Sequence, residues 1–236
     1  MGSKHSPAIV RDGLVLCLDA GLPRSFDGSG SWTDLVGGVE LAKEGSPTWS
    51  SNLFGGYFSG GASDRYIQET TSVGITLTTQ VTLCAWYRKT GSGGSSNQRI
   101  VEVWGGSAAS SGHTLNVNSS SGDTEMWLND NGNDTSNRFI TTTTDDTFAD
   151  NVWHYMVGTY SSPALNIYMD GVLNKTGSTA VTSSLDDINS ISVGSYAGGA
   201  GYNIDGDIAI VQIYNKALSA AEVKQNYNAQ KGRFGL

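Results

Sequence analysis

The sequence predicts an all-β protein, a sandwich of two antiparallel sheets with one short C-terminal helix. Glycine accounts for 31 of the 236 residues, about twice the usual ~7% share. Gly, Ser, Thr and Asn fill the intervals between short apolar runs, which is typical of many strands joined by many turns. A single sandwich of this length buries roughly 70–75% of its unfolded surface, so it needs no disulfide or metal staples.

The clearest strands lie between Val152 and Thr176. Alternate residues from Leu165 to Met169 are apolar, which indicates a half-buried strand. Asp170 and Gly171 follow, and both residue types accept the positive φ of a two-residue hairpin turn. The run from Val152 to Tyr160 is apolar on both faces, which predicts a central strand covered on each side.

Further strands are predicted wherever apolar runs are bounded by turn residues. In chain order they span Leu14–Asp19, Gly55–Gln68 (two short strands), Gln80–Lys89, Arg99–Trp104, His113–Val117, Thr124–Leu128, Arg138–Thr142, Ile188–Gly194 and Asp205–Tyr214. The sequence contains neither a repeat at fixed period nor a linker that would divide it.

A helix is predicted after the last strand. Ser219 is followed three residues later by Glu222, which is the pattern of a capping box. Leu218 and Val223 occupy the positions of a hydrophobic staple around it. Gly232 is expected to end the helix.

These elements divide the chain into an arm at residues 1–12, a single all-β domain at 13–230 and a tail at 231–236. The arm carries Lys4, Pro7 and Arg11 and lacks the alternation that would let it join a sheet. A basic arm on an acidic body suits an acidic patch on a larger assembly. We therefore expect Lys4, Pro7 and Arg11 to dock on a protein partner.

Charge and cysteine usage narrow the class of protein. The net charge is −8 and the chain has no basic stripe, which disfavours nucleic-acid binding. No apolar run reaches the ~20 residues of a membrane span, and the first residues lack the apolar core of a signal peptide. Cys17 and Cys84 each lie inside an apolar strand, so free, buried thiols are favoured over a disulfide.

Four segments resemble laminin G-like domains, a branch of the concanavalin A-like jelly rolls. They read WHYMVGTY with LNIYMDGVL, GLVLCLDAGLPRSFDGSGSW, GGYFSGGASDRYIQ, and IDGDIAIVQIYNKALSAAEVKQNYNA. The second and fourth are most similar to domains of tailed-phage (cyanophage-like) virion proteins. The resemblance implies a concanavalin A-like jelly roll across nearly the whole chain.

The resemblance also implies a calcium site at the sandwich rim, with Asp19, Asp64, Asp205 and Asp207 in the family's rim motifs. Ca²⁺ requires six to eight oxygen ligands. The alternative role for each aspartate is to stabilise a turn. Asp130 and Asp134 form a second candidate, although their loop lacks the closing Glu of an EF-hand.

Aromatic side chains are candidates for stacking on sugar faces. Those selected are Trp104, Trp127, Tyr196 and Tyr202. Core filling is the alternative role for most aromatic residues in the chain. Tyr202, in the Gly-rich loop GSYAGGAGYN, is expected to be the most exposed.

Catalysis is not expected. Laminarinase-type relatives of this superfamily carry Glu-x-Asp-x-Glu on one strand, which aligns an acid and a nucleophile on one face. Here the nearest pair is Asp123 and Glu125, which we interpret as a solvated strand start. The family resemblance makes His154 structural.

Two functional hypotheses follow from the resemblance. The first is a structural or decoration protein of a tailed-phage virion, made in the host cytoplasm and bound to capsid or tail proteins. The alternative is a carbohydrate-binding adhesin module that attaches the particle to host-surface glycans. Whether the protein forms a homo-oligomer stays open.

Overall fold

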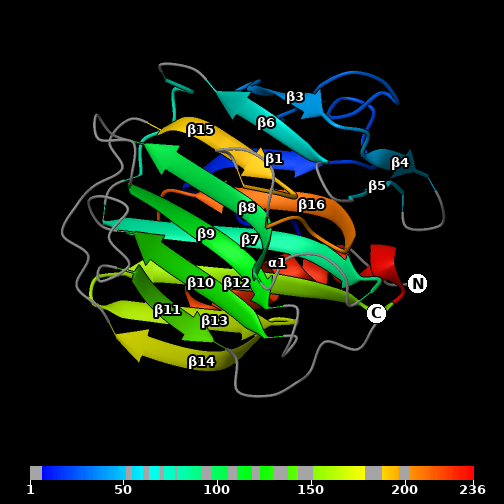
Figure 1. The fold of residues 1–236 in the computed structure, drawn as a ribbon. Coiled ribbons are helices and arrows are strands. Elements are labelled where there is room, and N and C mark those ends of the chain that lie inside the picture. The colour runs from blue at the N-terminus through cyan, green and yellow to red at the C-terminus, as the bar shows by residue number, and fades with distance from the viewer. Residues whose placement is uncertain are drawn as a thin grey trace.

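The computed structural model describes residues 7–51, 55–60, 64–69, 72–77, 79–91, 97–105, 111–118, 123–129, 138–142, 151–178, 188–196 and 202–236. These form two eight-stranded sheets packed face to face, with a helix behind one of them (Figure 1). Every strand pair is antiparallel. The all-β sandwich prediction is confirmed.

One layer is named the β7 sheet. Its strands run in the order β14 (Val172–Ser178), β13 (Ala164–Met169), β12 (Trp153–Ser161), β7 (Gln80–Lys89), β16 (Gly206–Tyr214), β5 (Tyr57–Ser59) and β4 (Thr48–Ser50), and β1 (Leu14–Asp19) also pairs with β16. The other layer, the β8 sheet, lies in front of it in Figure 1. Its strands run β11 (Arg138–Thr142), β10 (Thr124–Asn129), β9 (Ser111–Asn118), β8 (Asn97–Gly105), β15 (Ile188–Val193), β6 (Arg65–Glu69), β3 (Glu40–Glu44) and β2 (Trp32–Thr33).

Two apolar clusters hold the layers together. The larger fills the space between the sheets and includes Leu83, Val101 and Leu115. The second lies on the other face of the β7 sheet, beneath helix α1 (Ala220–Gln230) and the 3₁₀ turn η2 (Lys231–Phe234). The β12 strand contributes to both, Met156 to the first and Tyr155 to the second. The prediction that this strand is covered on both faces is confirmed.

The turn and helix-cap predictions are confirmed as well. Asp170 and Gly171 have φ values of 51° and 75°. The Glu222 backbone N–H donates to Ser219 Oγ over 3.3 Å, and the Ser219 N–H donates to Glu222 Oε2 over 2.8 Å. Leu218 and Val223 lie in one buried cluster, as a staple requires.

Replacing Ser219 with alanine is expected to destabilise the protein by about 1 kcal/mol. The variant would lose the hydrogen bond to the capping hydroxyl, while Glu222 would still accept a hydrogen bond from the backbone N–H of residue 219. Lys216 hydrogen-bonds Glu222 and lowers the pKa of that carboxyl from its usual 4.5, so this part of the cap is lost as the pH falls through the lowered pKa. Amide exchange at Ala221 and Glu222 tests the cap: equal protection in parent and variant would contradict it.

The predicted helix end at Gly232 is wrong. The chain continues as η2 through Phe234, and the left-handed residue that stops it is Gly235, with φ 77°. The physical reason is the burial of Phe234, whose ring stacks on Trp86 with centroids 4.1 Å apart. Trp86 Nε1 also donates to Gln230 Oε1 over 2.9 Å. The tail at 231–236 is thereby packed on the domain.

Part of the predicted arm also contacts the domain. Val10 is buried, its N–H donates to Asn226 Oδ1 over 2.7 Å, and its carbonyl accepts from Tyr214 Oη over 3.0 Å. Figure 1 shows the two chain ends at the same edge of the sandwich. Pro7 and Arg11 are exposed, and Lys4 lies outside the described residues.

Three strands were not predicted: β2, β3 and β4. They span two, five and three residues, and β3 buries only Leu41. A short strand with no more than one buried side chain gives no alternation to detect.

The free-thiol prediction is confirmed: Cys17 and Cys84 are both buried and unbridged. The strand register places Gln212 between them, so they sit on strands that are not neighbours. Burial raises the pKa of each thiol to about 12. Both therefore stay protonated and unreactive at neutral pH.

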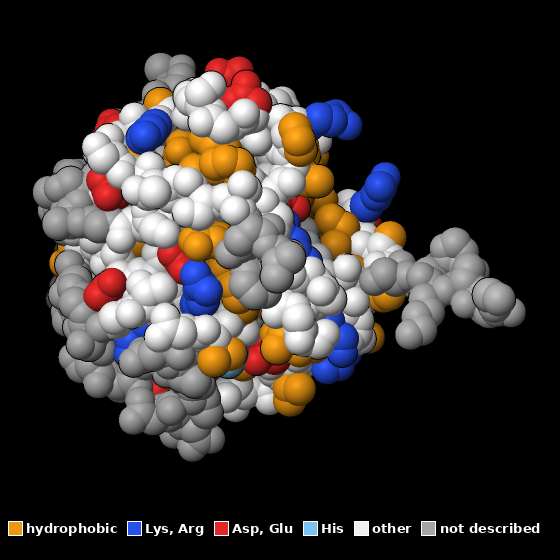
Figure 2. Space-filling view, turned by 90° about the vertical axis from the view of Figure 1, so that its right-hand side faces the viewer, with side chains coloured by type: hydrophobic (Ala, Val, Ile, Leu, Met, Phe, Trp, Pro, Cys, Tyr) orange, Lys and Arg blue, Asp and Glu red, His pale blue; other side chains and the backbone are white. Residues whose placement is uncertain are grey.

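No helix in the described residues is both long enough and apolar enough to cross a bilayer. Figure 2 shows the face turned away to the right in Figure 1, with acidic and basic side chains intermixed among the described residues. The described part of this face therefore carries no broad basic patch of the kind that binds phosphate backbones.

Candidate functional site

The aromatic residues selected from the sequence meet on the outer face of the β8 sheet. Val101 and Val103 point into the core between the sheets, so the alternating neighbours Glu102 and Trp104 face outward. The Trp104 and Tyr196 ring centroids are 6.2 Å apart, and those of Tyr196 and Tyr202 are 5.9 Å apart. We call Trp104, Tyr196 and Tyr202 the aromatic platform.

Arg99 joins the three aromatic segments at one point. Its guanidinium carbon lies 4.5 Å from the Tyr196 ring centroid, 4.7 Å from that of Tyr202 and 5.9 Å from that of Trp127. Contacts within ~6 Å of a ring are in cation–π range. Arg99 is 5% exposed and Tyr202 is 39% exposed, so the cation supports rings that still reach solvent. Arg99 was not predicted as a site residue, because nothing in the sequence around it distinguishes it from other strand residues.

Trp127 has a different place from the other three. It is 3% exposed, so its ring lies beneath the site rather than on the surface. Its Nε1–H donates to Glu125 Oε2 over 2.8 Å, and Asn118 Nδ2 donates to Glu125 Oε1 over 3.3 Å. Glu125 itself is 6% exposed. The interpretation of Glu125 as part of a solvated strand start is therefore wrong, because the residue faces a covered polar layer.

The glutamate on the neighbouring strand is equally fixed. Glu102 is fully buried, is ion-paired with Arg99 and accepts a hydrogen bond from Trp104 Nε1. The pair thus couples one ring of the platform to the cation below it. Glu102 and Glu125 are both engaged by side chains of their own face, which is a supporting role and not that of an exposed acid and nucleophile.

One polar side chain of this layer has unmet hydrogen-bonding capacity. Asn116 is fully buried, and neither its amide nitrogen nor its amide oxygen has a hydrogen-bond partner among the residues that the structure describes. The register places it on β9 between Arg99 of β8 and Glu125 of β10. An unmet buried polar group costs about 1–3 kcal/mol. A cost of this size calls for an explanation, and a functional role of the site would supply one.

The backbone around Tyr196 and Tyr202 is held by several hydrogen bonds. The Arg99 N–H donates to the Tyr202 carbonyl over 2.8 Å, and Arg65 Nη1 donates to the Tyr196 carbonyl over 2.5 Å. Ser195 Oγ donates to Asn203 Oδ1 over 2.7 Å. Tyr202 has φ 55°, a conformation that is strained for a bulky residue and is often found at functional sites.

The four aspartates predicted to bind calcium do not form one cluster. Asp19 is ion-paired with Arg233, and Asp207 with Arg88. Asp64 Oδ1 accepts from the Ser46 N–H over 2.6 Å, and the Asp205 backbone N–H donates to Gln98 Oε1 over 2.9 Å. Among the described residues no group of three or more His, Cys, Asp or Glu side chains could hold a metal ion.

At Asp19 and Asp207, an arginine side chain therefore occupies the position next to the carboxylate that a bound cation would take. The donor set at these two positions does not fit Ca²⁺ as it is arranged. Asp130 and Asp134 lie outside the described residues. Calcium binding stays a prediction of the family resemblance.

His154 has the structural role expected of it. Its Nδ1 lies 2.8 Å from Asp170 Oδ2, while Asp170 Oδ1 accepts from the Tyr155 N–H over 2.9 Å. The aspartate of the hairpin turn is thereby tied to the neighbouring strand.

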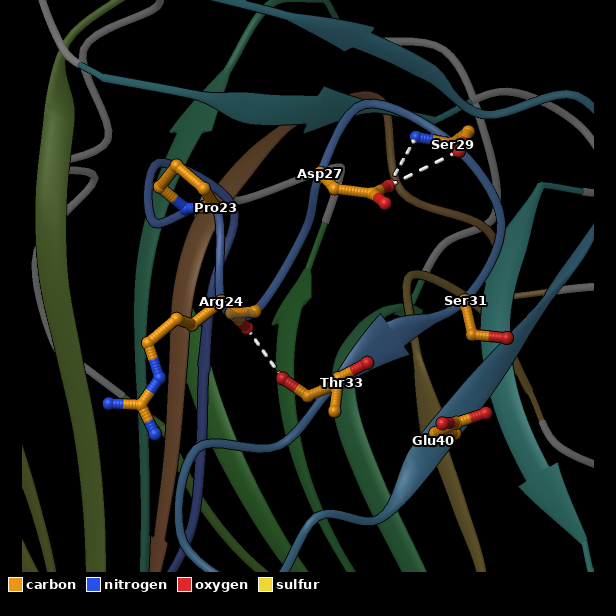
Figure 3. A pocket seen from close by; sticks show the side chains of 8 residues that line it. Pro23, Arg24, Asp27, Ser29, Ser31, Thr33 and Glu40 are labelled. Atoms are coloured by element: carbon orange, nitrogen blue, oxygen red, sulfur yellow. Dashed lines mark hydrogen bonds between the residues drawn. The ribbon is translucent and has the colours of Figure 1, made fainter.

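A hollow opens between the loop after β1 and strands β2 and β3. It measures about 280 Å³ and is lined by Pro23, Arg24, Ser25, Asp27, Ser29, Ser31, Thr33 and Glu40. Figure 3 shows Arg24 extending away from Asp27 and Glu40. Asp27 Oδ1 accepts from the Ser29 N–H and hydroxyl, over 3.0 and 3.2 Å. No aromatic ring lines this hollow, so it offers polar contacts without a stacking surface.

Comparisons with known proteins agree with this architecture. Residues 59–224 match the laminin G model described as the concanavalin A-like lectin/glucanases superfamily. No curated protein sequence matches the chain.

Similar solved structures share the fold at low sequence identity. The binding domain of botulinum neurotoxin DC in complex with SialylT is 16% identical with a TM-score of 0.64, and covers 94% of this chain and 52% of its own. The binding domain of Paraclostridial mosquitocidal protein 1 is 14% identical with a TM-score of 0.68, and covers 92% and 52%. Domain 4 of a Geobacillus stearothermophilus GH43 arabinanase, in complex with arabinotriose, is 13% identical with a TM-score of 0.66, and covers 91% and 98%.

This chain spans about half the length of the two toxin binding domains and nearly the whole of the arabinanase domain. Since these identities are low, the likeness concerns the fold. The match of the family model over more than half of the sequence goes further. The chain belongs to the laminin G branch of the concanavalin A-like lectin/glucanase superfamily.

Proposed function

We propose that the protein is a non-enzymatic carbohydrate-binding module whose ligand lies on the aromatic platform. The observation that carries this proposal is that Tyr196 and Tyr202 lie over Arg99 while Trp104 packs against Tyr196. Ligand sites combine apolar surface with a few fixed polar groups, and tyrosine and tryptophan supply both an apolar ring and a polar edge.

The polar layer below the platform supports the same function. The Arg99–Glu102 pair and the Glu125–Trp127 hydrogen bond hold the rings in place before a ligand arrives. A preorganised surface loses less conformational freedom on binding, and this favours affinity. Structures with this fold that contain SialylT or arabinotriose add support by analogy of fold.

Replacing Tyr202 with alanine is expected to weaken oligosaccharide binding at least tenfold, about 1.4 kcal/mol. The variant removes the most exposed ring of the platform. A glycan array would identify a ligand, and isothermal titration would give Kd for parent and variant. Val172→Ala is a matched control, since Val172 is 61% exposed on the other sheet. Binding by Tyr202→Ala at parental affinity, or no binding by the folded parent protein, would contradict the proposal.

A second proposal concerns where the module acts. The segments from Gly13 to Trp32 and from Ile204 to Ala229 resemble virion domains of tailed phages, and this favours a decoration or adhesion role on a particle. The partners would be capsid or tail proteins, with host-surface glycans as ligand. Deleting residues 1–7 tests attachment without removing Val10, which packs on the domain. Retained incorporation of the folded truncated protein into particles would refute docking through Lys4 and Pro7.

A further inference from the structure

The charges around the aromatic platform are already paired. Arg99 forms an ion pair with Glu102. Arg65, which holds the Tyr196 carbonyl, forms an ion pair with Glu44 over 2.5 Å. Each guanidinium next to the platform is therefore neutralised by a carboxylate of the protein.

A further carboxylate lies in the same layer with neutral partners. Glu125 accepts hydrogen bonds from Trp127 Nε1 and Asn118 Nδ2. On the described part of this face, Arg99 is thus accompanied by two glutamates: Glu102, its ion-pair partner, and Glu125, on the other side of Asn116 in the strand register. The whole chain has a net charge of −8. Among the described side chains of this face, an anionic ligand would therefore meet like charge without an unpaired cation to offset its desolvation.

Asn116 points to the kind of group that the site accepts. Its buried amide has one donor and one acceptor side, and both are without partners. A hydroxyl group both donates and accepts. One sugar hydroxyl, directly or through a single ordered water, can pair both sides, whereas a carboxylate can only accept.

We propose that the site takes a neutral oligosaccharide, recognised through its hydroxyl groups by the Asn116 amide, and rejects sugars that carry a carboxylate. The inference rests on the proposed function and narrows it to one ligand class. It separates this chain from neighbours of the same fold, such as the neurotoxin domain solved with N-acetylneuraminic acid. The shared fold would then carry a site of different electrostatic character.

Matched pairs of ligands test the charge preference. N-acetyllactosamine is compared with its sialylated form, and arabinotriose with trigalacturonate, by isothermal titration of the full chain at 50 and 150 mM salt. The neutral member is expected to bind at least tenfold more tightly in the pair that the protein recognises. The affinity for the carboxylated members should rise when the salt concentration is raised, because screening weakens the repulsion between like charges.

The outcomes separate the two proposals. A carboxylated sugar that binds as tightly as its neutral partner, or more tightly, overturns the neutral-ligand inference and leaves carbohydrate binding intact. If no carbohydrate binds in these pairs or on a glycan array, the proposed function itself fails and the inference falls with it.

Two variants test the named residues. Asn116→Leu should weaken neutral-sugar binding at least tenfold while the thermal midpoint stays equal or rises, because the unmet amide is removed without loss of volume. Unchanged affinity would remove Asn116 from the site. Glu125→Gln, which keeps an acceptor for Trp127, should reduce the preference for neutral over carboxylated sugar severalfold. An unchanged preference in this variant would refute the charge explanation even if Asn116→Leu failed to fold.

Discussion

Replacing Phe234 with alanine is expected to lower the free energy of unfolding by about 3–5 kcal/mol. Phe234 is 5% exposed, although it lies only two residues before Leu236, the last residue of the sequence. Its ring stacks on Trp86 and lies 5.0 Å from the Trp153 centroid. Truncation would leave a cavity above the β7 sheet and release η2 from that sheet.

The measurement is a urea melt of parent and variant, with Leu236→Ala as control. Leu236 is 48% exposed two residues further on, so its truncation should change stability by no more than about 0.5 kcal/mol. If the two variants melt alike, the C-terminal tail is not part of the packed domain.

Replacing Gly171 with valine is expected to cost at least about 2 kcal/mol. The residue has φ 75°, where a β-branched side chain is strained by about 1–3 kcal/mol. A Cβ added there would lie 2.8 Å from Lys224 Cδ and 3.0 Å from Tyr227 Cβ. The lysine tail can move, but the Tyr227 Cβ is fixed to helix α1. The steric cost is therefore added to the backbone strain.

Gly28→Val separates the two contributions. Gly28 has φ 104°, and a Cβ there would have nothing within 4 Å, so only the backbone strain applies. In thermal melts, the melting temperature of Gly171→Val should be well below that of Gly28→Val. Equal melting temperatures would show that the hairpin turn does not press on α1.

Much of the fold could be predicted from the sequence because its central strands alternate strongly. The β13 strand and the turn at Gly171 follow from period and turn chemistry alone. The end of the helix could not be predicted, because glycine at 232 is a stop signal locally while burial of Phe234 overrides it. Likewise, Val10 is apolar within a polar segment, and only its contacts with α1 reveal that it is anchored.

The site was predictable in residue type but not in assembly. Trp104, Tyr196 and Tyr202 could be selected as aromatic residues near loops. That the three rings meet beside Arg99, with Tyr196 and Tyr202 over its guanidinium, depends on the pairing of β8 with β9 and β15, which is a property of the folded sheet. From the sequence, Glu125 is predicted to be solvent-exposed because it lies in a polar segment. In the structure, the outer face of its strand is covered and the side chain is buried. A possible signal was the alternation of polar and apolar residues on β8, β9 and β10, which places Glu102, Asn116 and Glu125 on one face.

The most direct test of the account is a heteronuclear NMR titration that follows the tryptophan indole N–H signals as a neutral oligosaccharide is added. The signal of Trp104 is expected to shift, because this ring belongs to the platform. The signals of Trp86 and Trp153 should stay in place, because both lie beneath α1 and η2 on the other sheet. Shifts at Trp49, which packs on Phe26 in the loop beside the hollow after β1, with none at Trp104 would contradict the account and place the ligand at that hollow.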